Sequence, residues 1–184
     1  IGSIFSEVGA SGKPGAVHFV VDSIPHLRSK GVEAESRYAV GDLNLHAGVT
    51  YDEAKFGRDV VPGLPLVAGG TASFAPNWSA TYGFDYGHGV GNFRLSATLA
   101  GKYSSAYNTG SDLNPLKIQK AYTLYDGQIA LSDASNEWSL ELWGRNLTDV
   151  TYYQVAFAAP FQSGSYDAFL GNPRTVGLTL RLHY

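Results

Sequence analysis

The 184-residue sequence contains no cysteine. This absence excludes disulfide bonds, thiolate metal sites and a cysteine nucleophile. Methionine is also absent, including at position 1, so we expect a processed chain or a fragment of a longer one. The first residues show no signal-peptide pattern.

Charge and long apolar runs are scarce as well. Charged residues make up 16% of the chain, against a usual share of about 25%. With a formal net charge of −3 and no basic run, a nucleic-acid partner is disfavoured. No apolar run approaches the ~20 residues of a membrane helix. Membrane-spanning β-strands are not excluded, because such a strand needs apolar residues only at every second position.

What the sequence does contain is alternation of apolar and polar residues with a period of two, whereas helical periodicity is weak. This pattern predicts an all-β chain. We expect about eight strands, at 16–23, 31–40, 43–54, 76–87, 92–104, 120–132, 137–146 and 174–184. The stretch SIFSEV within residues 1–15 gives thin support for the end of an earlier strand.

The connections between these strands alternate in length from the second strand onward. A soluble sandwich has no reason to place every long loop at one end, whereas an outer-membrane barrel has short periplasmic turns and long outer loops. The short link IPHLRSK after the first strand is a mild exception. Tight turns fall at 41–42, 88–92 and 133–136, and long segments fall at 55–75, 105–119 and 147–173.

Each predicted strand has an uncharged face and a charged face. Lipid against the uncharged face would explain the separation, because Lys or Arg facing lipid at mid-bilayer costs about 2–4 kcal/mol. The charged face suits a wet or plugged lumen, since buried unpaired charges are unfavourable. We expect no charge on the uncharged face. The charged face carries Asp22, Glu33, Glu35, Arg37, Asp52, Asp85, Arg94, Lys102, Asp126, Glu141, Arg145 and Arg181.

Aromatic residues lie near both ends of the uncharged face. Two such belts are expected where a barrel crosses the two lipid–water boundaries. Strand propensity alone would also enrich aromatics. If the chain ends in the periplasm, the inner belt contains Tyr38, Tyr86, Phe93, Trp138 and Tyr184, and the outer belt contains Tyr51, Trp78 and Tyr103.

Several of these segments together resemble a known family. WSLELWGRNLTDVTYY at 138–153 and GNPRTVGLTLRLHY at 171–184 resemble the C-terminal end of TonB-dependent receptors, the plugged outer-membrane transporters of Gram-negative bacteria. Residues 29–56 and 75–86 resemble the family's strand–turn–strand and the strand that returns from its long loop. The resemblance implies a barrel of about 22 strands filled by a plug domain. Residues 1–184 would then be an antiparallel meander forming the C-terminal segment of this large transmembrane β-barrel, without the plug, the TonB box or the first strands.

The resemblance also implies a function. Such receptors take up scarce, bulky nutrients, most often ferric siderophores, with energy from TonB acting through the plug. The implied partners are outer-membrane lipid, TonB, the barrel-assembly machinery and a small-molecule ligand, with no cofactor, metal or enzymatic activity. The last strand would be the signal read by the assembly machinery, by strand addition. Carried over, this signal comprises Gly177, Leu178, Leu180, Leu182 and Tyr184.

Two other interpretations stay open. The chain could be a complete, small eight-stranded outer-membrane barrel with adhesive or enzymatic loops. It could also be a soluble binding barrel of the lipocalin type, with its uncharged face inside.

The remaining motifs favour no enzyme. The histidines have no metal-site spacing and suit a lumen or turns. Glu33 and Glu35 share a face, where hydrogen bonds to Arg and plug residues fit better than a glycosidase pair. GHGVG at 87–91 lies in a hairpin and opens no helix, so it is no phosphate loop. The five histidines are His18, His26, His46, His88 and His183.

The long segments 55–75 and 147–173 are rich in aromatic residues. Aromatic and Arg side chains lead binding hot spots, so these loops could capture a large ligand. The same side chains could instead pack against each other. Neither interpretation singles out a ligand-binding residue. The candidates are Phe56, Arg58, Tyr152, Tyr153, Phe157, Phe161, Tyr166 and Phe169.

Overall fold

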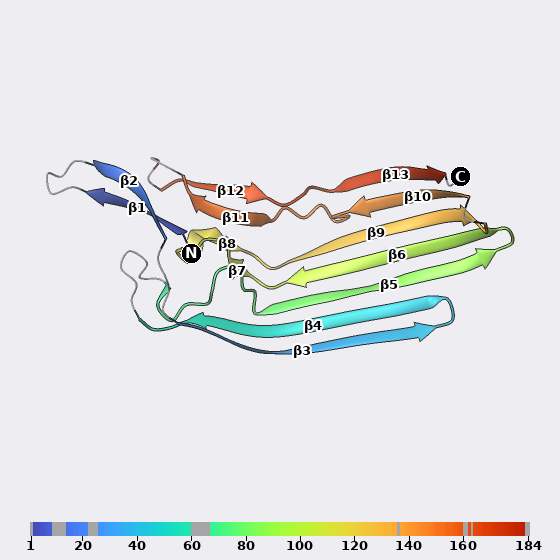
Figure 1. Cartoon of the computed structure of the whole chain (residues 1–184), viewed down its shortest axis with the longest axis horizontal. Coiled ribbons are helices and arrows are strands. Elements are labelled where there is room, and N and C mark those ends of the chain that lie inside the picture. Colours follow the sequence, from blue (N-terminus) through green and yellow to red (C-terminus); the bar gives the residue numbers. More distant parts are fainter. Residues whose placement is uncertain are drawn as a thin grey trace.

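A computed structural model describes residues 2–8, 14–21, 26–59, 67–135, 137–159, 162 and 164–182, and side chains from residue 26 onward. Nearly all of its regular structure is β-strand (Figure 1). No helix among these residues is long and apolar enough to cross a bilayer.

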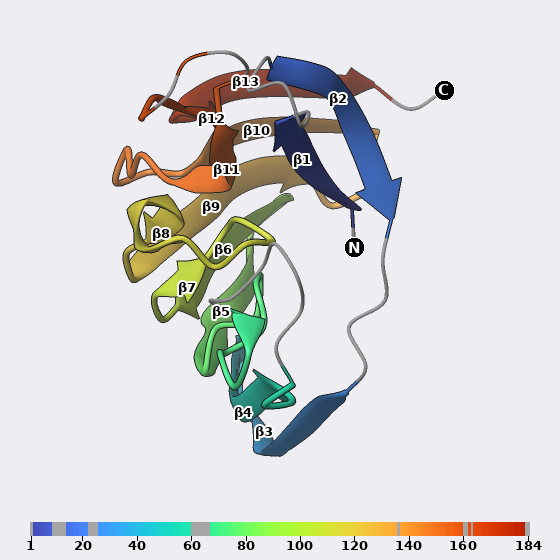
Figure 2. The same ribbon diagram turned by 90° about the vertical axis from the view of Figure 1, so that its left-hand side faces the viewer.

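The main feature is a wall of seven antiparallel strands in the order β13-β10-β9-β6-β5-β4-β3. Each wall strand pairs with the next wall strand along the chain, which confirms the predicted antiparallel meander. Seen end on in Figure 2, the wall follows an open arc from β3 to β13. The strands are β3 (Leu27–Val40), β4 (Leu43–Phe56), β5 (Trp78–Val90), β6 (Phe93–Ser104), β9 (Tyr122–Asp133), β10 (Trp138–Arg145) and β13 (Thr175–Leu182).

The first predicted strand, at 16–23, lies outside this wall. It corresponds to β2 (Pro14–Val21), which pairs with β1 (Gly2–Val8) in a separate two-stranded sheet. The weakly supported SIFSEV segment is thus a strand. Pairing with this neighbour closes only a short loop, which has a small entropic cost.

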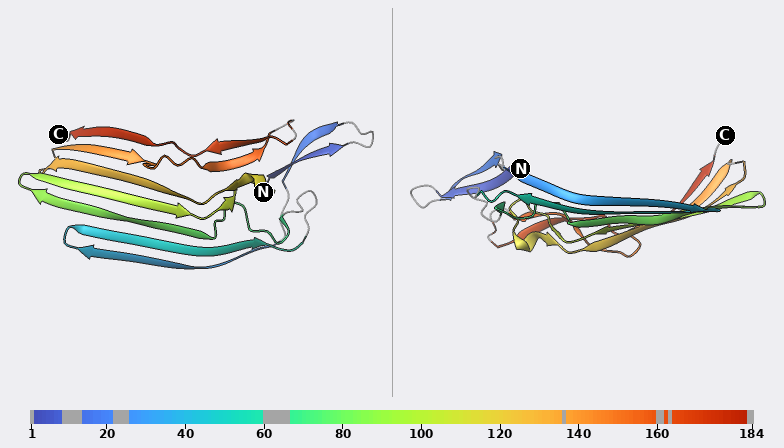
Figure 3. Two further views of the ribbon diagram at one scale, coloured as in Figure 1. Left: turned by 180° about the vertical axis from the view of Figure 1, so that it is seen from behind. Right: turned by 90° about the horizontal axis from the view of Figure 1, so that it is seen from below.

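The two ends of the wall differ in their connections (Figures 1 and 3). At one end β3–β4 and β5–β6 are joined by two-residue turns, and their first residues, Gly41 and Gly91, have φ of 56° and 60°. Hairpin turns of this length require positive φ, which glycine adopts without strain. The long loops emerge at the other end, which we call the outer end. The alternation of short and long connections is therefore confirmed.

The long loops contain secondary structure that the sequence patterns did not predict. Between β6 and β9 lie β7 (Tyr107–Asn108), a 3-10 turn η2 (Pro115–Lys117) and β8 (Ile118–Gln119), and β7 pairs with β8. Between β10 and β13, β11 (Tyr153–Ala158) pairs with β12 (Tyr166–Leu170).

The strand register tests the faces predicted one strand at a time. Directly opposite residues in antiparallel strands share a face. Tyr38 pairs with Leu45, which pairs with Phe84, which in turn pairs with Leu99. At the far side of the wall, Leu140 pairs with Leu180. The uncharged positions therefore form one continuous face across the seven strands.

The expectation of no charge on that face was wrong at the strand ends. Glu53 shares the parity of Tyr51, and it pairs with Lys30. At the opposite end, Asp133 pairs with Phe93. Glu53 lies beyond the outer aromatic Tyr51, whereas Asp133 lies level with Phe93 at the last residue of β9, so both charges are at strand ends that water can reach.

Aromatic pairs mark both ends of the uncharged face. Tyr51 and Trp78 are cross-strand partners with ring centroids 4.9 Å apart. Toward the short turns, Phe93 and Trp138 are 6.1 Å apart in an edge-on arrangement. The predicted positions of these four rings at opposite ends are confirmed, whereas Tyr184 lies outside the described residues.

Candidate luminal face and outer loops

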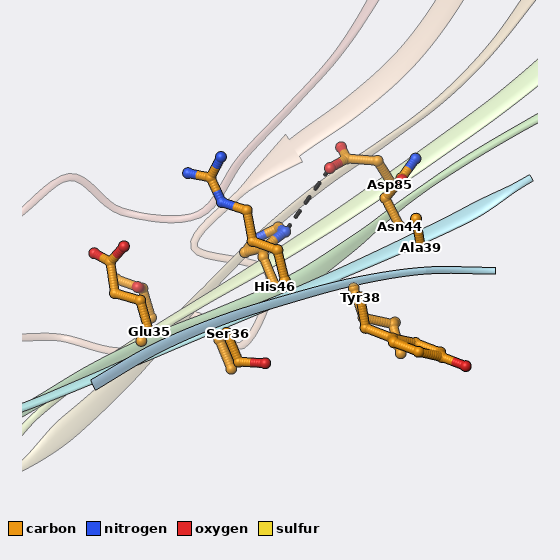
Figure 4. A pocket seen from close by; sticks show the side chains of 12 residues that line it. Glu35, Ser36, Tyr38, Ala39, Asn44, His46 and Asp85 are labelled. Atoms are coloured by element: carbon orange, nitrogen blue, oxygen red, sulfur yellow. Dashed lines mark ion pairs between the residues drawn. The ribbon is translucent and has the colours of Figure 1, made fainter.

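The charged face forms a polar groove over β3, β4 and β5, with a volume of about 590 Å³. In Figure 4, Glu35, His46 and Asp85 project to one side of the sheet, whereas Ser36 and Tyr38 project to the other. The His46 Nδ1 atom lies 3.8 Å from Asp85 Oδ2. Thus the groove alternates acidic and basic groups on one face, which suits a polar partner or water better than an apolar ligand.

A second charged patch lies on the same face over β10 and β13. The Arg181 guanidinium donates a hydrogen bond to the Glu141 carboxylate. Next to this pair, Trp143 Nε1 donates to Thr179 Oγ1 at 3.0 Å. Glu141, Trp143 and Arg181, together with Asp126 and Gln128, line a groove of about 260 Å³. Seven of the twelve charged residues predicted for this face line the two grooves, and Asp22 lies outside the described residues.

The described residues of the proposed assembly signal, which exclude Tyr184, lie on both faces of β13. Gly177 is opposite Trp143, and a Cβ added at Gly177 would overlap the indole ring. Leu178, Leu180 and Leu182 lie on the uncharged face and are 67%, 61% and 56% exposed. Gly177 therefore has a packing role of its own, while an assembly role for the set stays a prediction.

The buried core of the described residues lies in the outer loops. Ala54 and Phe56 at the end of β4 pack against Val67 and Ala72 of the following loop, with Leu113 beside them. The loop backbone runs back along β4, with Phe56 N donating to Gly70 O at 2.9 Å and Ala72 N to Ala54 O at 2.8 Å. The outer end of β4 is thereby covered on the charged-face side.

A buried lysine organises the loop between β6 and β9. Lys117 Nζ donates to Asp112 Oδ2 at 2.8 Å and lies 5.7 Å from the centre of the Tyr166 ring. The side chain of Asn114 also donates to the Tyr166 hydroxyl at 3.0 Å. In addition, Tyr153 N donates to Gln119 Oε1 at 2.6 Å. The loop of β7 and β8 is therefore tied to the β11–β12 hairpin, which makes one outer-loop assembly.

Several of the aromatic candidates pack against one another. Tyr152 stacks on Tyr122 with centroids 4.8 Å apart, and Phe157 lies 5.6 Å from Phe169. Phe56 is buried in the loop core. Packing thus accounts for Phe56, Tyr152 and Phe157, whereas Tyr153 and Tyr166 remain about a third exposed, at 38% and 36%, and Phe169 is 62% exposed. Phe161 lies outside the described residues.

A cavity of about 580 Å³ opens between two of the outer loops. Apolar residues from both loops line it, including Trp78, Tyr107, Leu113 and Ile118. Asn77 and Asn108 add amide groups to this lining. The mixture of aromatic, aliphatic and amide groups suits a small organic ligand.

Sequence reasoning missed the role of Asn146, which follows β10. Asn146 is buried, and its Nδ2 donates to Val150 O at 2.9 Å and to Asn172 O at 3.1 Å. Its Oδ1 accepts from Val150 N at 2.9 Å, and its backbone N donates to Asp126 Oδ1 at 2.8 Å. The signal was an Asn directly after a strand, a residue type that tolerates positive φ, here 48°.

The other predicted chemical motifs are consistent with a structural role. In the described part of the chain, no three His, Asp or Glu residues could together hold a metal ion. His26 and His88 each lie beside one aspartate, at 3.3 Å from Asp59 and 2.6 Å from Asp42. The segment 87–91 spans the end of β5 and its turn, as predicted, and opens no helix.

These observations define a class of protein. A wall that is uncharged on one face, charged on the other and bounded by aromatic pairs is typical of a large transmembrane β-barrel. The comparisons then identify the family. The profile described as "TonB dependent receptor-like, beta-barrel" matches residues 3–147, so the chain belongs to the TonB-dependent receptor β-barrel family.

Solved structures of similar fold are receptors from Gram-negative bacteria. The ferric yersiniabactin uptake receptor FyuA of Yersinia pestis matches at 19% identity with a TM-score of 0.73, over 85% of this chain and 23% of its own length. The ferric-catecholate import receptor Fiu of Escherichia coli K12 matches at 18% identity and a TM-score of 0.63, over 97% of this chain and 23% of its own. BauA, the ferric preacinetobactin receptor of Acinetobacter baumannii, matches at 20% identity and a TM-score of 0.63, over 97% of this chain and 25% of its own length.

At these identities the matches show the fold alone. The chain spans about a quarter of the length of these receptors. A comparison with curated proteins returns no match.

Proposed function

We propose that residues 1–184 form wall, lumen lining and outer loops of an outer-membrane receptor for a scarce, bulky nutrient. A ferric siderophore is the ligand that fits best. The observation that carries the proposal is the wall itself, which has one continuous uncharged face, one charged face and every long loop at one end. Family membership and the likeness to three iron-chelate receptors support it.

The remaining partners follow from this proposal. Outer-membrane lipid covers the uncharged face, and a plug domain outside this chain fills the lumen and couples it to TonB. The barrel-assembly machinery recognises the last strand. The chain has no enzymatic role and needs no cofactor. The interpretations as a complete eight-stranded barrel and as a soluble lipocalin-type barrel find no support in the family match.

The outer loops are the proposed site of ligand capture. The cavity between Trp78, Tyr107 and Ile118 lies at the outer end and is lined by aromatic and amide groups. The hydrogen bond between Asn114 and Tyr166 holds the β6–β9 loop, which lines one side of this cavity, against the β11–β12 hairpin. Preorganised loops lose less conformational entropy on binding, which favours affinity.

Iron uptake by cells carrying the full-length protein tests the proposal. Uptake of labelled ferric siderophores is measured in a strain that lacks the protein, in the complemented strain, and in the complemented strain without TonB. We expect uptake only in the complemented strain with TonB. Surface binding should persist without TonB. Uptake that does not depend on TonB, or the absence of binding across a panel of ferric chelates, would overturn the proposal.

A further inference from the structure

A group of charged residues lies on the membrane side of the wall, just beyond the outer aromatic pair. Lys30 and Glu53 are cross-strand partners, as are Arg28 and Lys55. All four have the parity of Val32 and Tyr51 and therefore belong to the uncharged face of the wall. We call them the basic cluster. Three cations and one carboxylate give it a formal net charge of +2.

One carboxylate holds the two lysines together. The Lys30 and Lys55 Nζ atoms lie 2.9 Å and 2.5 Å from Glu53 oxygens. The ion pairs with Lys55 and Lys30 favour the ionised form of Glu53. The Lys30 side chain remains 62% exposed and the Lys55 side chain 51% exposed. Both ammonium groups are therefore near each other and open to a further anion.

The other side of this strand segment is closed. Ala54 and Phe56, which alternate with Glu53 and Lys55, are buried against the following loop. The cationic side chains therefore face away from the lumen, toward the surroundings of the barrel wall.

The height of the basic cluster matches the headgroup layer. Tyr51 and Trp78 mark the outer boundary of the uncharged face. Lys55 lies four residues further along β4, which is about 13 Å along a strand and roughly 10 Å along the membrane normal for a tilted barrel strand. Aromatic rings sit at the lipid–water interface, so charged groups at this distance meet the polar headgroups.

We propose that the basic cluster binds the phosphate of a lipid headgroup in the outer leaflet. A headgroup phosphate carries one negative charge as a diester and up to about two as a monoester, and its acceptor oxygens complement clustered ammonium and guanidinium groups. Lys and Arg near a membrane surface favour anionic lipid in this way. The proposal rests on the proposed membrane placement and is independent of the transported ligand.

Lipid retention by the purified full-length protein tests this site. Phosphatidic acid or phosphatidylcholine is titrated in neutral detergent, and bound lipid is counted by native mass spectrometry. We expect the variant Lys30→Gln/Lys55→Gln to bind phosphatidic acid about 30-fold more weakly, with phosphatidylcholine unchanged. The matched control Arg37→Gln/Lys102→Gln removes the same charge from the charged face and should leave retention unchanged.

Two further measurements distinguish other outcomes. Glu53→Gln removes the competing carboxylate and should raise retention of phosphatidic acid, which a misfolded protein would not do. Inorganic phosphate should compete only weakly, because it lacks the acyl chains that place the lipid phosphate at this height. Equal retention by both double variants, or full displacement by inorganic phosphate, would overturn the site. Failure of the unmodified protein to insert into vesicles would instead contradict the proposed function.

Discussion

At the scale of single residues, Asn146 joins the end of one wall strand to the start of another. Its side chain makes three hydrogen bonds, and one of them reaches Asn172, which precedes β13. Because Asn146 is buried, the partners that lose these bonds could not all turn to water.

The first prediction concerns removal of this amide. Asn146→Ala should destabilise the folded full-length protein by about 2–4 kcal/mol, since buried donors and acceptors lose their partners. The measurement is urea unfolding in lipid vesicles. Thr148→Ala, at an exposed position of the same turn, is the control and should change stability little. Equal stability of both variants would show that the Asn146 bonds contribute nothing net.

The second prediction concerns the contact between Trp143 and Gly177. Gly177→Val places methyl groups where the indole ring lies and should destabilise the protein by about 1–3 kcal/mol. In the double variant Gly177→Val/Trp143→Ala this clash is absent, so the two effects should be less than additive in the same unfolding assay. Full additivity would contradict the contact. Val176→Ala, on the opposite face, is the control.

At the scale of the strands, the pairing register determines which residues lie on the uncharged face and which lie on the charged face. Leu140 and Leu180 are paired on the uncharged face, whereas their neighbours Glu141 and Thr179 are paired on the charged face. A shift by one residue would exchange the two faces completely. Adjacent residues of the same two strands therefore serve as matched probes.

The third prediction uses spin labels at these positions. Labels at 140 and 180 should be accessible to oxygen and shielded from a water-soluble relaxation agent in vesicles, because oxygen concentrates in lipid. Labels at 141 and 179 should show less oxygen access. Power-saturation spectroscopy of the reconstituted full-length protein measures both accessibilities. If the water-soluble agent reaches 140 and 180 while oxygen does not, the barrel assignment fails.

The strands also show what the sequence could predict. Strand positions, and the faces of the wall strands apart from their ends, were predicted correctly because alternation is local, with a period of two. The loop strands β7, β8, β11 and β12 were missed because each is short and depends on distant contacts. Tyr153 is held by Gln119, 34 residues away, and Asn114 by Tyr166, 52 residues away. Such pairings carry no periodic signal, and for the same reason the loop cavity could not be predicted.

At the scale of the whole molecule, the described chain combines an open wall with a packed outer-loop assembly. Buried side chains such as Val67, Thr109 and Lys117 lie in the loops rather than in the wall. This distribution fits a barrel whose wall is surrounded by lipid and lumen contents, while its loops must be ordered by their own contacts.

The last prediction tests whether this loop order serves binding. Asn114→Ala/Lys117→Ala removes the hydrogen bond to Tyr166, the ion pair with Asp112 and the cation–π contact. If the loops capture the ligand as proposed, the full-length variant should bind its ferric siderophore about tenfold more weakly, because the loops must then be ordered at the moment of binding. Isothermal titration of the purified protein measures this affinity. Leu116→Ala, in the same 3-10 turn and 70% exposed, should leave it unchanged. Unaltered affinity in the double variant, with strand content intact by circular dichroism, would mean that the loop assembly orders itself for stability and that the ligand is captured elsewhere.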